Sequence, residues 1–327
     1  MHSTQTASGP AIEVRDLRRD YGSVQAVRGV SFEVARGEVF CLLGPNGAGK
    51  TTTVEILEGY RHRSGGEARV LGIDPATGAR ALREQVGIVL QQCGVQGDLT
   101  VAELLEMYGR YHVRHRPVDE VLELVELTEK RDVRAKALSG GQRRRLDLAL
   151  ALVGEPELIF LDEPTTGFDP AARRQAWETI RSLCGLGKTV FLTTHFMDEA
   201  QYLADRVAVM RGGEIIALGR PDELGGRDAR PAEIRFTLPV TVAPGDLPAL
   251  PVTRRAIEGD RVMLETDDPV TATHALTGWA LERGVRLTHF SVTQPTLEDI
   301  YLELTGSAAH AAGAGAPEGS PQTEIHA

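Results

Sequence analysis

The chain has 327 residues, of which 42% are apolar and 25% charged, the balance of a globular protein with room for one large and one small domain. Its net charge of −10 argues against non-specific binding to nucleic acid, because that binding needs a basic surface. No apolar run approaches the roughly 20 residues that a membrane helix needs, and residues 1–10 lack the basic and apolar blocks of a signal peptide. Cys41, Cys93 and Cys184 stand at no metal-type spacing, so we expect a reduced, cytosolic protein that reaches a membrane only as a peripheral partner.

The first expected elements are strands. Residues 12–15 and 30–34 alternate apolar and polar side chains, which predicts half-buried antiparallel strands. Residues 38–43 are nearly continuously apolar and run into a glycine, which is typical of a buried strand that feeds a tight loop. Residues 51–57 then predict a helix with Gly59 at its C-terminal cap.

The loop between this strand and this helix has the pattern of a P-loop. Its glycines let the backbone curl so that several amides face one anion, and the following helix adds its dipole. Lys50 would reach the β- and γ-phosphates of a nucleotide, and the Thr51 hydroxyl would bind Mg²⁺. The strand–loop–helix context weighs against an incidental glycine loop. The residues assigned to nucleotide binding here are Gly44, Pro45, Asn46, Gly47, Ala48, Gly49, Lys50, Thr51 and Thr52.

A helix-rich, charged region follows at residues 101–136. Thr100 and Glu103 fit a capping box that opens a helix through Tyr108. The region ends at Leu138-Ser139-Gly140-Gly141-Gln142, where a serine hydroxyl and glycine amides at a helix start would form an anion site. An ordinary N-cap would explain the serine but not the full string.

Two other features of this region carry no separate chemistry. His112 and His115 are three residues apart among arginines, which predicts a solvated helix face rather than a zinc site. Arg143-Arg144-Arg145 directly follows the glycine string, so we interpret it as a cationic helix face near nucleotide or subunit contacts rather than as a nucleic-acid patch.

Further buried strands are expected at 157–162 and 188–193. The first ends in Asp162 and Glu163. In a P-loop protein Asp162 would hold Mg²⁺, mainly through water, and the next carboxylate stands where it can polarise an attacking water. Capping of the next turn would explain either acid, but not both beside a P-loop. The second strand runs into Thr194 and His195.

The remaining chain predicts a hairpin and a second, smaller domain. Residues 206–210 and 214–218 pair around Gly212-Gly213, and the Pro-, Gly- and Asp-rich stretch 221–231 predicts a domain boundary. Beyond it we expect strands at 232–238, 261–265 and 285–292 and helices around 271–283 and 296–304.

The P-loop, the Leu-Ser-Gly-Gly-Gln string and Leu161-Asp162-Glu163-Pro164, in that order, resemble the nucleotide-binding subunit of an ABC transporter. The resemblance implies an α/β P-loop NTPase domain of the ABC type, with a mixed sheet core, an antiparallel β subdomain and a helical subdomain, followed by a small C-terminal α/β domain. The expected divisions are a disordered N-terminus at 1–10, the ATPase domain at 11–225 with its helical subdomain at about 92–140, the small α/β domain at 226–306 and a disordered tail at 307–327.

The resemblance also implies roles for single residues at the hydrolysis site. Glu163 matches the general base, and His195 matches the switch histidine that faces the γ-phosphate. Gln91 looks like the glutamine that contacts Mg²⁺ and links to the membrane partner, although the adjacent Gln92 is an alternative. Together with Thr51 and Asp162, Gln91 completes the expected Mg²⁺ set.

Three further segments match the family around the nucleotide. Ser139, Gly140, Gly141 and Gln142 match the signature motif, which binds the γ-phosphate of ATP held by the other subunit. Tyr21 matches the aromatic residue that stacks on adenine, although an aromatic residue in a hairpin also packs for structural reasons. Residues 167–169 stand at the D-loop position, with Phe168 where the family more often has leucine.

The resemblance therefore implies an ATPase that uses ATP and Mg²⁺ and works as a homodimer, or with a close paralogue, because each composite site needs two copies. Residues 142–149 and 296–306 look like the daunorubicin-resistance (ABC-2) type of bacterial exporter ATPase. In that group a separate permease spans the membrane, substrates are often drugs, antibiotics or lipids, and the ATPase lies peripherally on the cytoplasmic face. An importer subunit and a non-transport ABC ATPase stay open as alternatives, and we expect no nucleic-acid partner.

Overall fold

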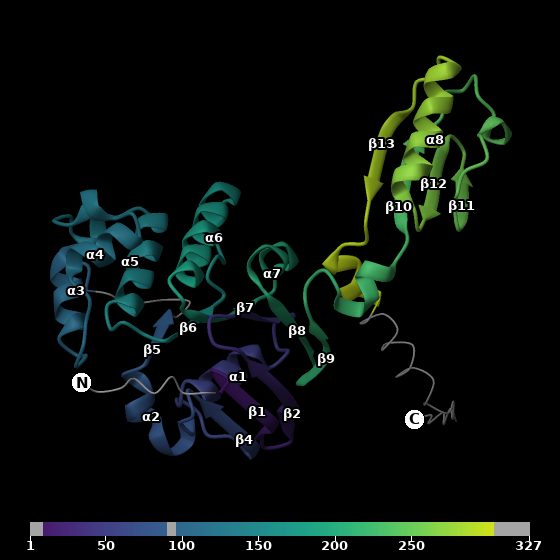
Figure 1. The fold of residues 1–327 in the computed structure, drawn as a ribbon. Helices are drawn as coiled ribbons and strands as arrows, with labels where there is room; N and C mark the ends of the chain where they lie inside the picture. The colour runs from purple at the N-terminus through teal and green to yellow at the C-terminus, as the bar shows by residue number, and fades with distance from the viewer. Residues whose placement is uncertain (1–8, 90–95, 304–327) are drawn as a thin grey trace, which may run out of the picture. The chain divides into compact units, whose positions relative to one another are not determined.

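A computed structural model of the chain describes residues 9–89 and 96–303 (Figure 1). The chain forms two compact units that divide between Pro221 and Asp222. Gln91 and Gln92 lie outside the described residues, as do residues 1–8 and 304–327, which include most of the expected disordered ends. No helix in the described ranges is long and apolar enough to cross a membrane.

A six-stranded sheet forms the centre of the first unit, in the order β5-β6-β7-β3-β8-β9. The first five strands in this order are parallel, and β9 pairs antiparallel with β8 across a turn at Gly212 and Gly213. Because parallel strands end at the same edge of a sheet, the residues that follow β3, β6 and β7 come together. The strands are β3 Val39–Leu43, β5 Val86–Val89, β6 Leu158–Asp162, β7 Thr189–Thr194, β8 Arg206–Arg211 and β9 Glu214–Gly219.

Aromatic packing holds the middle of this sheet. Every residue of β3 and of β7 is buried, as their apolar runs predicted. The Phe191 ring on β7 contacts the rings of Phe32, Phe40 and Phe160, with centroids 5.9, 5.6 and 5.7 Å away. Such pairs contribute about 0.5–1.5 kcal/mol each beyond the apolar area they bury. The strands whose ends lie together at one edge are therefore tied to one another within the core.

A three-stranded antiparallel sheet, in the order β2-β1-β4, packs into the same core. Its strands are β1 Ile12–Tyr21, β2 Val24–Val34 and β4 Gly65–Val70. The alternation at 12–15 and 30–34 predicted parts of β1 and β2, which are longer than those patterns. The predicted first helix is confirmed as α1 Lys50–Leu57, and Gly59 follows it with a φ of +79°. Helix α2, Pro75–Arg83, follows β4.

The helices α3 Val101–Gly109, α4 Val118–Leu124 and α5 Gly140–Leu152 lie together at one end of the first unit (Figure 1). The predicted capping box is confirmed, because the Thr100 side chain accepts from the Glu103 amide and the Glu103 carboxylate accepts from the Thr100 amide. Three helices were not predicted: α2, α6 Pro170–Gly185 and α7 Met197–Leu203. A start signal for α6 is present, since the Asp169 carboxylate caps the helix and proline occupies its first position.

The second unit is a four-stranded antiparallel sheet, in the order β11-β12-β10-β13, packed against one helix. Its elements are β10 Ala232–Thr237, β11 Arg254–Glu258, β12 Arg261–Thr266, α8 Pro269–Glu282 and β13 Thr288–Thr293. The sequence missed β11, an edge strand with three charged side chains out of five. Strand β13 begins at Thr288, later than predicted, because the chain leaves α8 through Gly284 at a φ of +63°. Residues 297–303 are helical, as expected.

A half-buried ion pair fixes the start of α2 and gives a testable pH dependence. The Arg63 guanidinium donates two hydrogen bonds of 2.7 Å to Asp74, which also caps α2 by accepting from the Ala76 amide. The bonds from Arg63 lower the pKa of Asp74 to about 2. A carboxyl group whose pKa is lowered by folding stabilises the fold at any pH above its pKa in the unfolded chain. That contribution is lost as the pH falls toward 2.

We therefore expect Asp74→Asn to lower the free energy of unfolding by about 1–2 kcal/mol at pH 7. In urea titrations between pH 7 and pH 3, the difference from wild type should shrink once the pH falls below about 4. Asp16→Asn removes the exposed pair with Arg18 and should leave the free energy of unfolding nearly unchanged, because solvent screens such pairs. A difference for Asp74→Asn that stays constant over this pH range would contradict the assignment.

Candidate active site

The loop after β3 is built by glycine geometry and by close packing. Gly47 and Gly49 have φ values of +79° and +103°, a region that side chains strain. A Cβ at Gly44 would lie 2.2 Å from the Met210 carbonyl oxygen, and one at Gly49 would lie 2.4 Å from the Ala26 carbonyl oxygen. The loop therefore adopts left-handed backbone conformations at Gly47 and Gly49, which lack side chains. It packs against β8 at Gly44 and against β2 at Gly49.

Lys50, the first residue of α1, folds back over this loop. Its side chain is buried, and Nζ donates to the carbonyl oxygens of Gly44 and Pro45 at 2.7 and 3.2 Å. Glu163 Oε1 lies 3.6 Å from the same ammonium. Burial lowers the pKa of Lys50, and the neighbouring Glu163 carboxylate opposes that effect. The predicted P-loop lysine thus stands beside the predicted base.

The end of β6 carries the two predicted carboxylates on a strained turn. Asp162 Oδ1 accepts a hydrogen bond of 2.5 Å from the Thr193 hydroxyl on β7. The Glu163 amide donates to both the carbonyl and the hydroxyl oxygen of Thr193, each at 3.1 Å. Glu163 has a φ of +47°, which is uncommon for a side chain of this kind. Such strain collects at functional sites, where the surrounding structure holds it.

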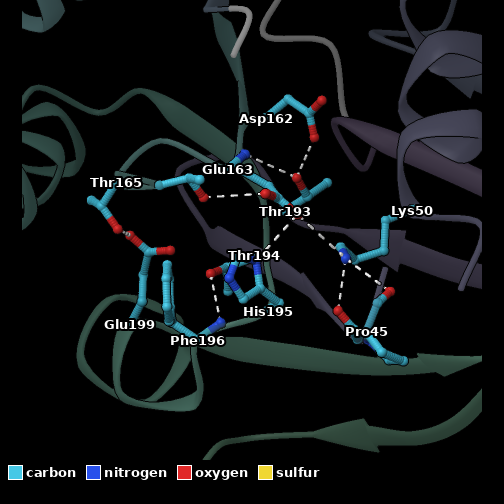
Figure 2. A network of polar contacts seen from close by, with 12 residues as sticks. Pro45, Lys50, Asp162, Glu163, Thr165, Thr193, Thr194, His195, Phe196 and Glu199 are labelled. Carbon is cyan, nitrogen blue, oxygen red and sulfur yellow. Dashed lines mark hydrogen bonds and ion pairs between the residues drawn. The ribbon is translucent and has the colours of Figure 1, made fainter. Parts of the chain in front are cut away.

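The end of β7 brings the predicted switch histidine to the same place. His195 Nδ1 is buried and lies 3.3 Å from Glu163 Oε1 (Figure 2). The second carboxylate oxygen, Oε2, accepts from the Thr166 hydroxyl at 3.1 Å. Lys50, Glu163 and His195, which are far apart in the sequence, therefore converge from three neighbouring strand ends.

The signature residues lie elsewhere on the first unit. Ser139 caps α5, and its side chain and that of Gln142 complete a reciprocal capping box. A Cβ at Gly140 or Gly141 would meet no atom within 4 Å, so the first turn of α5 is open to an approaching group. These four residues line an open depression of about 760 Å³ together with residues 166–169, and neither Lys50 nor His195 lines it.

The predicted adenine-stacking residue, Tyr21, stands at the end of β1. Its side chain is 37% exposed, and two guanidinium groups lie near its ring. Those of Arg19 and Arg61 are 4.5 and 5.3 Å from the ring centroid. Strand alternation places Arg19 on the same side as Tyr21 and could have signalled that contact, whereas Arg61 arrives only through the fold.

The structure adds residues that the motifs did not identify. The Thr193 hydroxyl donates to the Asp162 carboxylate and accepts from the Glu163 amide, and the Thr166 hydroxyl donates to the Glu163 carboxylate. The Thr194 hydroxyl accepts from the Phe196 amide at 3.0 Å. Thr193 and Thr194 directly precede His195 at a buried strand end. That position could have identified their hydroxyl groups as part of the site.

The oxygen groups beside the P-loop fit Mg²⁺. The ion prefers oxygen ligands in near-octahedral geometry and is usually held by one or two carboxylates together with substrate phosphates. Asp162 at the end of β6 supplies a carboxylate, and Thr51, an exposed residue at the second position of α1, supplies a hydroxyl. Across residues 9–89 and 96–303, no cluster of three or more His, Cys, Asp or Glu side chains could hold a metal by itself. The site therefore suits an ion that arrives with a nucleotide.

Comparisons with known proteins agree with this geometry. Residues 27–166 match the family model "ABC transporter", and residues 232–296 match "ABC transporter domain-containing protein-like, C-terminal domain". The Nod factor export ATP-binding protein I of Rhizobium meliloti is 41% identical over 90% of this chain and 88% of its own length. The daunorubicin resistance ATP-binding protein DrrA3 of Streptomyces coeruleorubidus is 39% identical over 90% and 96%. The ADP conformation of MJ1267, an ATP-binding cassette of an ABC transporter, superposes with a TM-score of 0.60 at 26% identity, over 65% of this chain and 92% of that one.

The fold and the P-loop site define an ATP-binding cassette, and the α/β fold predicted from the sequence is confirmed. The chain belongs to the family of ABC transporter ATP-binding proteins, and it is an ATPase of that type.

The close packing of the P-loop gives a prediction about its two left-handed glycines. A Cβ at Gly47 would meet nothing within 4 Å, whereas one at Gly49 would clash with backbone. We expect Gly47→Ala to lower the free energy of unfolding by about 1–2 kcal/mol, the cost of the left-handed conformation alone. Gly49→Ala should cost a further 1–3 kcal/mol or so, because the loop must also move.

Urea unfolding without nucleotide measures both variants, and Gly47→Ala serves as the matched control for backbone strain. Equal losses for the two variants would mean that the contact between Gly49 and the Ala26 carbonyl does not hold the loop.

Proposed function

We propose that the chain hydrolyses ATP to power a bacterial exporter, with Glu163 as the general base. The observation that carries this proposal is the convergence of Lys50, Glu163 and His195, with contacts of 3.6 and 3.3 Å to the same carboxylate oxygen. A base that activates water must lie within hydrogen-bond reach of it and beside the groups that bind the transferred phosphoryl group.

Each side chain in this cluster takes one part of the work. Lys50 binds the β- and γ-phosphates and offsets charge that develops on the γ-phosphoryl group. Glu163 orients the attacking water and accepts its proton, and His195 contacts the γ-phosphate. The residues assigned to bind the phosphates are Gly44, Pro45, Asn46, Gly47, Ala48, Gly49, Lys50, Thr51 and Thr52.

Asp162 and Thr51 would hold Mg²⁺, with Gln91 as a third ligand. When bound, the ion neutralises charge on the phosphate oxygens. The 2.5 Å bond from Thr193 fixes the direction of the Asp162 carboxylate, which would hold the ion.

Two copies of the chain would complete each nucleotide site. Ser139, Gly140, Gly141 and Gln142 present an open helix start, but they line a depression that Lys50 and His195 do not share. The serine hydroxyl and the glycine amides would therefore bind the γ-phosphate of ATP held by the partner copy. Tyr21 would stack on the adenine. ATP binding then closes a homodimer, or a dimer with a close paralogue, and hydrolysis opens it.

The exporter assignment rests on the relatives. The two reported above are named for Nod factor export and for daunorubicin resistance, and this chain covers most of their length. We infer that the chain works on the cytoplasmic face of a membrane as the peripheral partner of a separate permease. Drugs, antibiotics and lipids are the substrate classes that fit this group of exporters.

The base assignment predicts the behaviour of Glu163→Gln. The amide keeps the shape of the side chain but cannot accept the proton, so kcat for ATP should fall at least 100-fold. The ATP-loaded variant should accumulate as a dimer, detected by size-exclusion light scattering with Mg-ATP. Glu157→Gln, an exposed change just before the same strand, should hydrolyse ATP like wild type. Normal turnover by Glu163→Gln would contradict the assignment.

The composite site predicts complementation between two inactive variants. Lys50→Ala destroys the P-loop half of each site, and Ser139→Arg blocks the signature half. A mixed dimer contains one site with both halves intact, so an equimolar mixture should recover part of the ATPase activity. The chain that carries both substitutions is the control and should recover none when it is mixed with Lys50→Ala. A mixture that forms mixed dimers and stays inactive would contradict the shared site.

A further inference from the structure

Glu199 is a buried carboxyl group that ATP hydrolysis as described above does not use. It lies in the first turn of α7, and its side chain is 0% exposed. Its Oε1 accepts hydrogen bonds from the Thr165 hydroxyl at 2.8 Å and from the Trp177 indole at 3.0 Å (Figure 2 shows the first). Burial raises the pKa of Glu199, although hydrogen bonds from Thr194, Thr165 and Trp177 oppose the rise. A buried carboxyl group is costly, so its position calls for a physical account.

One of these donors belongs to the turn that carries the proposed base. Thr165 follows Glu163 by two residues and is itself fully buried, and the next residue, Thr166, donates to Glu163 Oε2. The Thr165–Glu199 bond therefore ties this turn to α7. The other donor, Trp177, lies on α6 and stacks on Tyr202 of α7, with ring centroids 5.0 Å apart. That second bond ties α6 to α7.

Helix α7 is in turn coupled to the switch histidine. Phe196 is the N-cap residue of α7, its amide donates to Thr194, and its ring lies 4.0 Å from that of His195. The Arg173 guanidinium of α6 lies 4.0 Å from the centroid of the Phe196 ring and 3.4 Å from Asp198. A displacement of α7 relative to the turn after β6 would therefore move His195 relative to Glu163.

We propose that Glu199 is a positioning residue that sets the separation between Glu163 and His195 through its bond to Thr165. The inference rests on the proposed roles of those two side chains. Without the Thr165 bond, the turn after β6 and helix α7 are free to shift against each other, and the contact of 3.3 Å between Glu163 Oε1 and His195 Nδ1 is no longer held. A misplacement of about 1 Å in reacting groups can cost on the order of 100-fold in rate.

A Glu199 that only stabilises the fold predicts a different result from a Glu199 that positions the base. The two hydrogen-bond donors to Glu199 Oε1 allow the two roles to be distinguished. Thr165→Val and Trp177→Phe each remove one hydrogen bond to Glu199 Oε1. Thr165→Val keeps the shape of the side chain, and Trp177→Phe keeps an aromatic ring against Tyr202 but is smaller. If Glu199 only stabilises the fold, both variants should lower the melting temperature and leave kcat alone. If Glu199 positions the base, Thr165→Val should lower kcat about tenfold or more with little change in KM, whereas Trp177→Phe should keep kcat within about twofold.

Variants at Glu199 itself complete the test. Glu199→Gln keeps an oxygen that accepts from Thr165, so it should keep kcat near wild type, whereas Glu199→Ala should lower kcat as Thr165→Val does. The double variant Thr165→Val with Glu199→Ala should be no slower than Glu199→Ala, because both act through one contact. Steady-state ATP hydrolysis is measured at saturating ATP and expressed per ATP-binding site, so that unfolded protein does not count.

The outcomes distinguish this inference from the proposed function. If Glu163→Gln, assayed in parallel, hydrolyses ATP normally, the base assignment fails and the positioning role fails with it. If Glu163→Gln is inactive while Thr165→Val and Glu199→Ala bind ATP and turn it over at the wild-type rate, the positioning role alone is wrong. A loss of kcat in Trp177→Phe equal to that in Thr165→Val would also overturn it.

Discussion

The parallel register of β3, β6 and β7 is the constraint on which the site depends. Leu43 pairs with Thr194 and Asp162 pairs with Thr193, so the loops that follow the three strands leave the sheet at one edge. A slip of one residue would turn alternate side chains to the opposite face of the sheet. The aromatic contacts of Phe191 within the core oppose such a slip, because its ring packs against those of the neighbouring strands. Apolar packing away from the chemistry thus determines where the polar groups meet.

The backbone, more than side-chain freedom, sets the direction of the proposed base. A left-handed residue other than glycine costs about 1–2 kcal/mol, and Glu163 occupies that region at a φ of +47°. The Glu163 amide donates to two oxygen atoms of Thr193, which offsets the cost and holds the turn against β7. Thr193 also donates to Asp162, so a single β7 residue orients the proposed metal ligand and the proposed base together.

The sequence predicted those parts of the site that consist of residues adjacent to one another in the chain. The P-loop with Lys50, the pair Asp162 and Glu163, and the string from Ser139 to Gln142 need only a strand or a helix beside them, and local patterns predict both. The bonds of Thr193 and Glu199 join residues about 30 positions apart in the chain, so they depend on strand register and helix packing that no local pattern contains. Strand β11 was missed for a related reason: its charged side chains fit an exposed edge, where apolar periodicity fades.

The charges around the loop favour binding of the nucleotide together with the proposed metal ion. Burial lowers the pKa of Lys50, and the carboxylates of Glu163 and Asp162 oppose that effect, so one ammonium group faces two acids. Apart from the loop amides, this arrangement has no surplus positive charge with which to receive a polyphosphate. A Mg²⁺ ion held by Asp162 would reverse the sign of the local charge. Lys50 can exchange its bonds to two neutral carbonyl groups for phosphate oxygens without leaving a buried charge unpaired. Binding of either ATP or Mg²⁺ alone would leave like charges facing each other, so we expect electrostatics to couple the binding of the two.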